Sequence, residues 1–231
     1  MLVGFHVEGW DYLVLRAYLA KSLDIPQAEI SADWIDGPGR GWQFILAELP
    51  RALRRFYYEC AQLVIIGIDN DGSEDVLKKG IQEDPKRPRH WLHTISPQPD
   101  TSCRRCELFR IVEETRPTLN WQPKKPGQMW PIVIAVPVET IEAWLLVSQA
   151  IMHPGQGSLH AENESRSGQK QRFYGMPEAT RDAVESIALP LIATMQAVHL
   201  ARLGDHAKSF AEFVEQIATL RERILTDPDC W

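Results

Sequence analysis

The sequence predicts an α/β protein with a parallel sheet, helices on both faces of the sheet and a helical region at the C-terminus. Three short apolar segments, residues 2–7, 63–68 and 132–136, have the length and composition of buried strands. Each is followed by a stretch whose apolar residues recur at helical spacing. Strands that alternate with helices favour a parallel sheet, because parallel neighbours need a crossover connection.

The first half of the chain begins with the strand LVGFHV at residues 2–7, which leads into an amphipathic helix at residues 10–23. A second helix is predicted at residues 44–60, where Pro50 must either start a turn or introduce a kink. The segment LVIIGI at residues 63–68 is apolar on both faces, as expected of a central parallel strand covered by helices.

The next part of the chain is interrupted by a polar insertion. A helix is predicted at residues 73–81. A proline-rich and polar loop insertion follows at about 84–106, and a helix pattern returns at residues 107–115. The third strand, residues 132–136, is followed by a helix at residues 139–152.

The last third of the chain is predicted to be helical after a polar start. Residues 153–172 are rich in glycine, serine and charged groups and predict a loop. The pattern is then helical over residues 177–225, with a break near Gly204. We therefore expect two units, an α/β domain at residues 1–152 and, at residues 153–231, a polar loop and C-terminal helices that pack on it.

The composition excludes several classes of protein. The 231 residues include 25 basic and 31 acidic side chains, and the net charge of −6 argues against a protein that coats DNA. Four cysteines are too few for a secreted disulfide scaffold, so free or metal-bound thiols are expected. No apolar run reaches the roughly 18 residues of a membrane span, and the N-terminus has no signal-like segment. We expect a soluble, cytoplasmic protein without a membrane partner.

Acidic side chains follow all three predicted strands. Glu8 follows the first strand, and Asp69 and Asp71 follow the second. Glu139 and Glu142 follow the third. The carboxyl ends of parallel strands meet at one edge of a sheet, so these groups are expected to converge there. Clustered carboxylates repel one another unless a cation lies between them, and hard oxygen ligands suit Mg²⁺ or Mn²⁺, which can polarise a phosphodiester and activate water.

Each acid on its own also has a purely structural interpretation. Acidic residues after a strand often cap the following helix, and Asp71 or Ser73 is placed to cap a helix that begins near Glu74. Acids at all three strand ends together favour a metal site instead. The segment is not an EF-hand loop, because the sixth and twelfth positions counted from Asp69 hold Glu74 and Gly80.

An apolar strand followed by Asp-x-Asp-Gly resembles the motif of haloacid-dehalogenase phosphatases, whose first aspartate is the nucleophile. That resemblance implies a phosphate-ester hydrolase with Asp69 as nucleophile. In those enzymes the aspartate strand normally comes first in the chain, whereas here a strand that ends at Glu8 precedes it.

The segments FHVEGWD at residues 5–11 and IIGIDNDG at residues 65–72 resemble a Toprim domain, in which a strand ends in Glu-Gly and a later strand ends in Asp-x-Asp. Toprim domains occur in topoisomerases, primases and nucleases of the OLD family. The resemblance implies a Toprim-like parallel sheet, an acid–base or metal role for Glu8, and divalent metal binding by Asp69 and Asp71.

A third segment, AVPVETIEAWLLV at residues 135–147, is similar to the Glu-Ala-Trp-Leu-Leu segment of a bacterial family related to OLD nucleases, domain-of-unknown-function family 4276. Residues 170–174 and 209–213 also resemble that family's C-terminal part. The resemblance implies a role in phage or mobile-element defence. The family pattern often has an acid where this chain has Ser148. The acids of this predicted helix are therefore Glu139 and Glu142, which lie three residues apart and share one helix face.

Cationic residues provide candidates for phosphate contact. Lys170 and Arg172 lie in the predicted polar loop, where a cation near the acids would stabilise charge on a phosphate. Residues 78–105 carry seven basic and three acidic side chains, and with His90 and Trp91 they could contact a nucleic-acid backbone and a base. A solvated surface is the alternative in both places.

A structural zinc site, separate from the acidic one, is also predicted. His90 and His93 are three residues apart, as are Cys103 and Cys106, which gives four zinc-type ligands in one short segment. A metal clasp would hold together a segment that has no apolar core of its own. The alternatives are reduced thiols, a redox pair and surface histidines.

These observations favour a divalent-metal-dependent nuclease that hydrolyses DNA or RNA. The predicted catalytic residues are Glu8, Glu142 and Lys170, and the predicted metal ligands are Asp69, Asp71 and Glu139. The alternatives are the phosphate-ester hydrolase and a non-catalytic partner-binding protein. OLD nucleases often carry a fused ATPase, so the family resemblance implies a separate ATPase partner, and a homo-oligomer is a further expectation.

Overall fold

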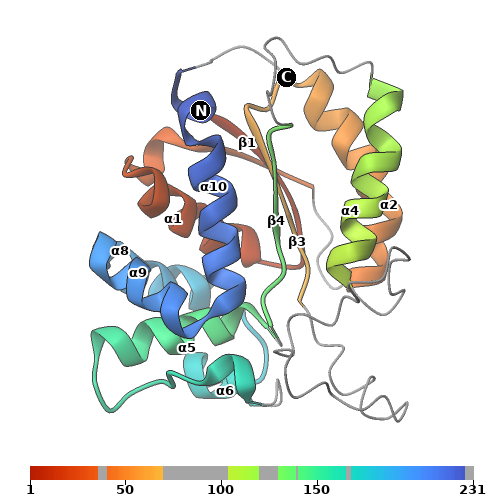
Figure 1. Ribbon diagram of the computed structural model, residues 1–231. Helices are drawn as coiled ribbons and strands as arrows, with labels where there is room; N and C mark the ends of the chain where they lie inside the picture. The colour runs from red at the N-terminus through yellow and green to blue at the C-terminus, as the bar shows by residue number, and fades with distance from the viewer. Residues whose placement is uncertain (36–40, 70–103, 120–129, 139, 165–167, 227–231) are drawn as a thin grey trace.

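The computed structural model describes residues 1–35, 41–69, 104–119, 130–138, 140–164 and 168–226. Its centre is a sheet of four parallel strands in the order β2-β1-β3-β4. The strands are β1 (Leu2–Val7), β2 (Ser31–Trp34), β3 (Leu63–Gly67) and β4 (Ile132–Ala135). The predicted α/β class with a parallel sheet is therefore confirmed (Figure 1).

The sequence did not predict β2. Its four residues, SADW, include two polar side chains, and none of them is fully buried, because β2 is an edge strand. The central strands β1 and β3 have the apolar composition expected of strands covered on both faces. Register pairs Val7 with Gly67 and Gly67 with Ala135, so the carboxyl ends of β1, β3 and β4 lie level.

Helices make up most of the rest of the described chain. They are α1 (Asp11–Leu23), α2 (Trp42–Tyr58), α4 (Arg104–Thr115), α5 (Ile141–Met152), α6 (Gln169–Tyr174), α7 (Arg181–Ala183), α8 (Leu189–Thr194), α9 (Ala197–His206) and α10 (Lys208–Thr226). Short 3₁₀ segments lie at Gln27–Glu29, Arg116–Leu119 and Ala161–Asn163, and a π-helical segment lies at Val184–Ala188. Helix α2 runs through Pro50 without ending there.

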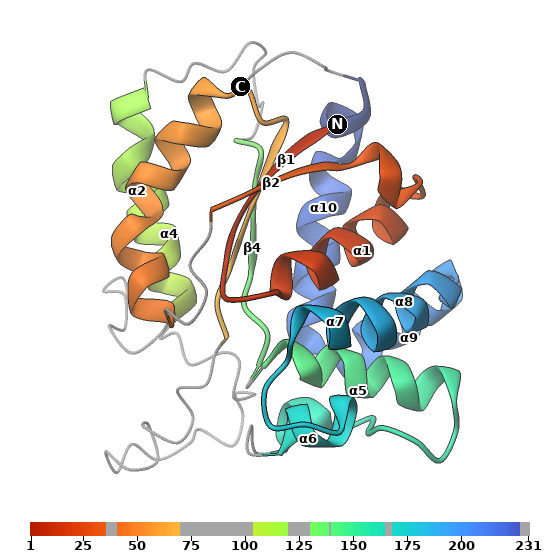
Figure 2. The same cartoon turned by 180° about the vertical axis from the view of Figure 1, so that it is seen from behind.

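The helices cover both faces of the sheet, as predicted (Figures 1 and 2). Helices α2 and α4 pack on one face around a core that includes Phe56 and Ile66. The ring of Phe56 lies so close to Gly4 that a Cβ there would come within 2.5 Å of it. Helices α1, α5 and α10 belong to the core of the other face, which includes Tyr18 and Trp144.

The C-terminal helices pack on the α/β part of the chain. Phe210 and Phe213 of α10 share one core with Val133 of β4, and this core also includes α8, packed on α1, and α9, packed on α5 and α10. A helical C-terminal region that packs on the sheet was predicted. The division of the chain into units at residues 152 and 153 stays a prediction.

Several predicted boundaries were wrong. Residues 153–172 were expected to form a loop, but α6 begins at Gln169 and places Lys170 and Arg172 on a helix. The predicted break near Gly204 lies at Ala207, after α9, and a second break follows α8. The end of the predicted loop insertion at about 84–106 is helical from Arg104 onward, whereas residues 84–103 and the predicted helix at residues 73–81 lie outside the described residues.

The outer edge of β4 is closed by a side chain of α10. The Gln216 amide donates to the carbonyl oxygen of Ile134 at 2.9 Å and accepts from the Ile134 N–H, also at 2.9 Å. The Ile132 N–H bonds to the Trp130 carbonyl at 2.8 Å. Ile132 and Ile134 lie two residues apart, so their backbone groups point to the same side of the strand, away from β3.

None of the helices in the described part of the chain is by itself long and apolar enough to cross a membrane. Arg181–Thr194 and Ala197–His206 meet the length and composition criteria only as a pair, and that pair is bent by 108°.

Candidate functional site

The turn after β1 places two acids near each other. Gly9 adopts a positive φ of 50°, which glycine accommodates without steric cost, and the chain reverses at once into α1. The Asp11 N–H donates to the Glu8 carbonyl oxygen at 3.2 Å, which closes this turn. Glu8 therefore ends β1 while Asp11 begins α1, and both lie at the carboxyl edge of the sheet.

Asp69 connects three elements at this edge. Its N–H donates to Glu8 Oε1 at 3.2 Å, which ties the end of β3 to the end of β1. Its Oδ1 accepts from the Ile141 N–H at 3.1 Å, at the first turn of α5. Asp69 therefore also binds a helix N-terminus, that of α5. The predicted convergence of Glu8 and Asp69 is confirmed.

Glu142 lies in the first turn of α5 and is 1% exposed. Its Oε2 is buried and has no hydrogen-bond partner in the described part of the chain. Burial raises the pKa of Glu142, while Lys170 and the Thr140 hydroxyl oppose that rise. Trp144, two residues on, is fully buried. An orphaned carboxylate oxygen at this position is the kind of group that a cation would satisfy.

Asp11 is the member of the site that the sequence did not predict. Loss of water raises the pKa of Asp11 well above its usual range, and the charges of Glu142 and Glu8 raise it further. The pKa of Asp69 is raised in the same way, by burial first and then by the charges of Asp11, Glu8 and Glu142. The signal for Asp11 was its position three residues after Glu8, just past the Gly9 turn, in EGWD.

We call Glu8, Asp11, Asp69 and Glu142 the acidic site. Lys170 is its cation: its charge lowers the pKa values of Asp11, Asp69 and Glu142, which places the ammonium group near all three. Lys170 reaches the site because it lies on α6, whereas Arg172 of the same helix forms an ion pair with Glu164.

Gln169 fixes α6 against the site. Its side chain is buried, and its Oε1 accepts from the Thr140 hydroxyl at 2.9 Å, next to the start of α5. Its Nε2 donates to the Ala161 carbonyl oxygen at 3.0 Å. This buried amide therefore links the helix that carries Lys170 to the helix that carries Glu142.

The donor chemistry of the acidic site fits a divalent cation with hard oxygen ligands. The supporting observation is the buried Oε2 of Glu142, which no described group satisfies. Among the described residues, no set of three or more acids, histidines or cysteines is arranged so that it could hold a metal ion. Two predicted ligands, Asp71 and Glu139, lie outside the described residues.

Glu142→Gln is expected to stabilise the protein in metal-free buffer at pH 8 by on the order of 1 kcal/mol, because it removes a buried charge. The folded-state pKa of Glu142 is raised, so at low pH the side chain is neutral and the folded protein carries no buried charge there. This advantage in unfolding free energy is lost as the pH rises through the raised pKa. The gain should therefore be absent at about pH 4 and present at pH 8.

Urea unfolding in the presence of EDTA measures this difference. Glu113→Gln on α4 is the control, since that side chain is exposed and pairs only with Arg116 among the described contacts. A gain of equal size at both pH values would contradict the assignment to a buried carboxylate.

The predicted zinc ligands His90, His93 and Cys103 lie outside the described residues, and so does the side chain of Cys106. The zinc site stays a prediction. Protein purified without a histidine tag is expected to contain one equivalent of zinc by elemental analysis, and Cys103→Ser is expected to release it. Clearly substoichiometric zinc in the wild type would contradict the prediction.

Two further residues bear on the sequence interpretation. His6 is fully buried, and its Nε2 lies 2.8 Å from the Ile45 carbonyl oxygen, so it contributes to the core rather than to the site. Burial lowers the pKa of His6. The expectation of free or metal-bound thiols is wrong for Cys60, which is disulfide-bonded.

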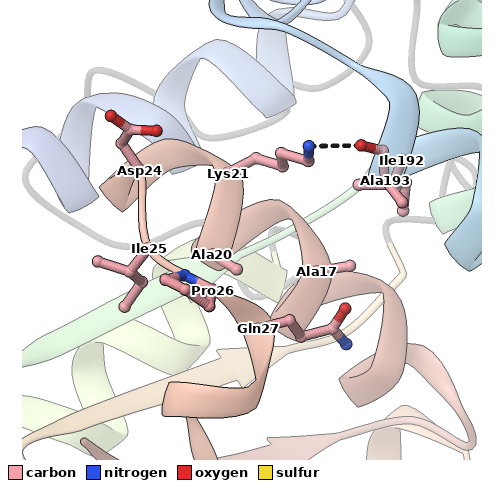
Figure 3. A pocket seen from close by; sticks show the side chains of 9 residues that line it. All are labelled: Ala17, Ala20, Lys21, Asp24, Ile25, Pro26, Gln27, Ile192 and Ala193. Carbon is pink, nitrogen blue, oxygen red and sulfur yellow. Dashed lines mark hydrogen bonds between the residues drawn. The ribbon is translucent and has the colours of Figure 1, made fainter.

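The molecule also has hollows away from the acidic site. A cavity of about 410 Å³ lies at the C-terminal end of α1, where Lys21 donates to the Ala193 carbonyl oxygen at 2.6 Å (Figure 3). A groove of about 980 Å³ between α9 and α10 shares Lys21 and Asp24 with it. No residue of the acidic site lines either hollow.

The chain matches no protein-family model, no curated protein and no solved structure. The resemblance to Toprim domains therefore stays a prediction, and the functional interpretation depends on the geometry described above.

Proposed function

We propose that this protein is a Toprim-type, divalent-metal-dependent nuclease that hydrolyses phosphodiester bonds of DNA or RNA. The observation that carries the proposal is the acidic site, in which four carboxylic acids from four elements meet at the carboxyl edge of a parallel sheet. Ligands of open α/β sheets bind at this edge.

The electrostatics of the acidic site support the need for a cation. Burial raises the pKa values of Asp11, Asp69 and Glu142. The charges of neighbouring acids raise those of Asp11 and Asp69 further. Lys170 is one positive charge beside four acids, so it balances only part of the negative charge when the acids are ionised. A fold that gathers acids at this cost in stability is typical of a functional site.

Specific roles follow from the positions of the side chains. Asp69, with Asp71, would hold Mg²⁺ or Mn²⁺, and such an ion polarises a phosphodiester and activates water. Glu8 accepts the Asp69 N–H through Oε1, so its carboxylate is oriented to take a proton from the attacking water. Lys170 would stabilise the charge that develops on the phosphate. Asp11 and Glu142 would complete the set of oxygen ligands, together with Glu139.

The sheet topology supports the Toprim-like interpretation. Glu8 and Asp69 follow β1 and β3, which are adjacent parallel strands. The Glu-Ala-Trp-Leu-Leu segment lies in α5, whose first turn bonds to Asp69. Three segments that carried the resemblance are therefore neighbours in space. From the same resemblance we propose a part in phage or mobile-element defence, with a separate ATPase as partner.

The test is a nuclease assay on single-stranded DNA, duplex DNA and RNA, with Mg²⁺, Mn²⁺ or EDTA. The wild type is expected to cleave at least one substrate with metal and none in EDTA. Glu8→Ala and Asp11→Asn are expected to lower the rate by roughly 100-fold or more. Glu113→Gln, an exposed acid on the opposite face of the sheet, should cleave at the wild-type rate.

The same assay separates the alternatives. A covalent aspartyl-phosphate on Asp69 would support the phosphate-ester hydrolase instead. Asp69 is 7% exposed and its Oδ1 already accepts the Ile141 N–H, which disfavours it as a nucleophile. Absence of both turnover and metal binding would support a non-catalytic, partner-binding protein.

A further inference from the structure

Aromatic rings gather directly beside the acidic site. Trp10 and Tyr12 flank Asp11 at the start of α1, and Trp34 ends β2, the strand next to β1. The ring centroids of Tyr12 and Trp34 are 4.6 Å apart with the rings 17° from parallel, and Trp10 lies 5.4 Å from Trp34. We call Trp10, Tyr12 and Trp34 the aromatic platform. It lies at the same edge of the sheet as Glu8.

The exposure of the platform separates it from the aromatic core. Tyr18, Trp144 and Phe210 also form a ring cluster, and all three are completely buried. The three platform residues pack against the core but are only partly buried. Aromatic residues that only completed the core would be fully buried, as Tyr18, Trp144 and Phe210 are.

A cation lies over the platform. The guanidinium of Arg181 is 6.0 Å from the ring centre of Trp10, and its side chain is 56% exposed. Its ion pair with Glu185 lies within one helical turn and leaves other N–H donors of the fork for a second acceptor. The positive charge, the aromatic rings and the acidic site therefore lie next to one another.

We propose that the aromatic platform stacks an unpaired base of a single-stranded nucleic acid, with Arg181 on a neighbouring phosphate, and so holds the strand across the acidic site. The inference rests on the proposed nuclease function and names its substrate class. Stacking on aromatic side chains accepts any base, because every base has a π face. Bases in a duplex are already stacked and paired, so a single strand is favoured.

The test compares binding of a labelled oligothymidylate, a fully abasic strand of equal length and a hairpin duplex. Fluorescence anisotropy is measured with Ca²⁺ in place of Mg²⁺, and strand integrity is checked on a gel. Wild type is expected to bind oligothymidylate about 10-fold or more tighter than the abasic strand. Trp10→Leu should lose that difference and keep its affinity for the abasic strand, whereas Trp10→Phe should retain most of it.

Tyr58→Ala is the control, because Tyr58 is an aromatic residue that is 74% exposed at the far end of α2. It should bind like the wild type. Arg181→Gln should weaken binding of both single strands equally. Equal wild-type affinity for oligothymidylate and the abasic strand, tighter binding of the hairpin, or no binding of any strand would overturn the inference.

Cleavage in Mg²⁺ is scored separately for the same proteins. Base-dependent binding without cleavage would contradict the nuclease function and support base stacking on the aromatic platform. Cleavage without base-dependent binding would support the nuclease function and contradict base stacking.

Discussion

Replacement of Asp69 by asparagine is expected to lower nuclease activity by roughly 100-fold or more and to raise the stability of the metal-free protein. Asparagine keeps an oxygen that can accept the Ile141 N–H, so the link to α5 is retained. It removes the negative charge that a cation would need. The two effects therefore have opposite signs, which a simple loss of folding cannot produce.

The gain in stability should be on the order of 1–3 kcal/mol at pH 8, because Asp69 is buried among three other acids. Because the folded-state pKa of Asp69 is raised, its charge destabilises the folded protein only above the pKa that this carboxyl has in the unfolded chain. The gain in stability should therefore vanish near pH 4. Thermal unfolding in EDTA at both pH values measures it. Addition of Mg²⁺ should raise the Tm of the wild type and leave the variant unchanged.

Asp182→Asn is the matched control, since Asp182 is an exposed acid on α7. Wild-type activity in Asp69→Asn would rule out a role for Asp69 as a ligand. Reduced stability of the Asp69→Asn variant in EDTA would show that the negative charge of Asp69 strengthens its bond to α5 by more than the repulsion between the acids costs.

Replacement of Trp144 by alanine is expected to cost about 3–5 kcal/mol of unfolding free energy. The indole is fully buried, and its ring centroid lies 5.2 Å from that of Phe210 and 5.6 Å from that of Phe213. Its Nε1 donates to the Ser209 hydroxyl at 2.7 Å, and that hydroxyl in turn bonds to Glu162. The substitution therefore opens a cavity and breaks a buried polar chain between α5 and α10.

Urea unfolding measures the change. Trp144→Phe keeps most of the apolar contact and should cost clearly less, which provides a folded variant if alanine prevents folding. Ile187→Ala, at a 38% exposed site, should cost less than about 1 kcal/mol. A loss below about 1 kcal/mol for Trp144→Ala would mean that the core between α5 and α10 readily collapses around the cavity.

The sequence predicted the centre of the site because that part depends on local patterns. Strands β1, β3 and β4 are apolar runs, and carboxyl ends of parallel strands must lie at one edge. Glu8 and Asp69 follow those runs directly, so their meeting needed no tertiary information. Glu142 was predicted from its place in the first turn of the following helix, and the structure puts it in the same site.

Other parts could not be predicted, because they depend on tertiary contacts. The sequence SADW of β2 is short and half polar, so no apolar run marks it, and it forms a strand because β1 offers it an edge. Asp11 has the position of an ordinary first-turn acid, and its role arises when α5 and α6 bring Glu142 and Lys170 to it. Helix α6 lies in a polar segment whose sequence does not indicate a helix. Its first residue, Gln169, accepts a hydrogen bond from Thr140, which precedes α5.

The amide of Gln216 has a consequence for how copies of this chain can associate. It bonds to both the backbone N–H and the carbonyl oxygen of Ile134, as a peptide unit of a neighbouring strand would. The backbone hydrogen bonding of the sheet therefore ends at β4. Another chain cannot add a strand at this position without first displacing it, so the sheet cannot serve there as a template for fibre growth. A homodimer that continues the sheet would have to form at β2 instead.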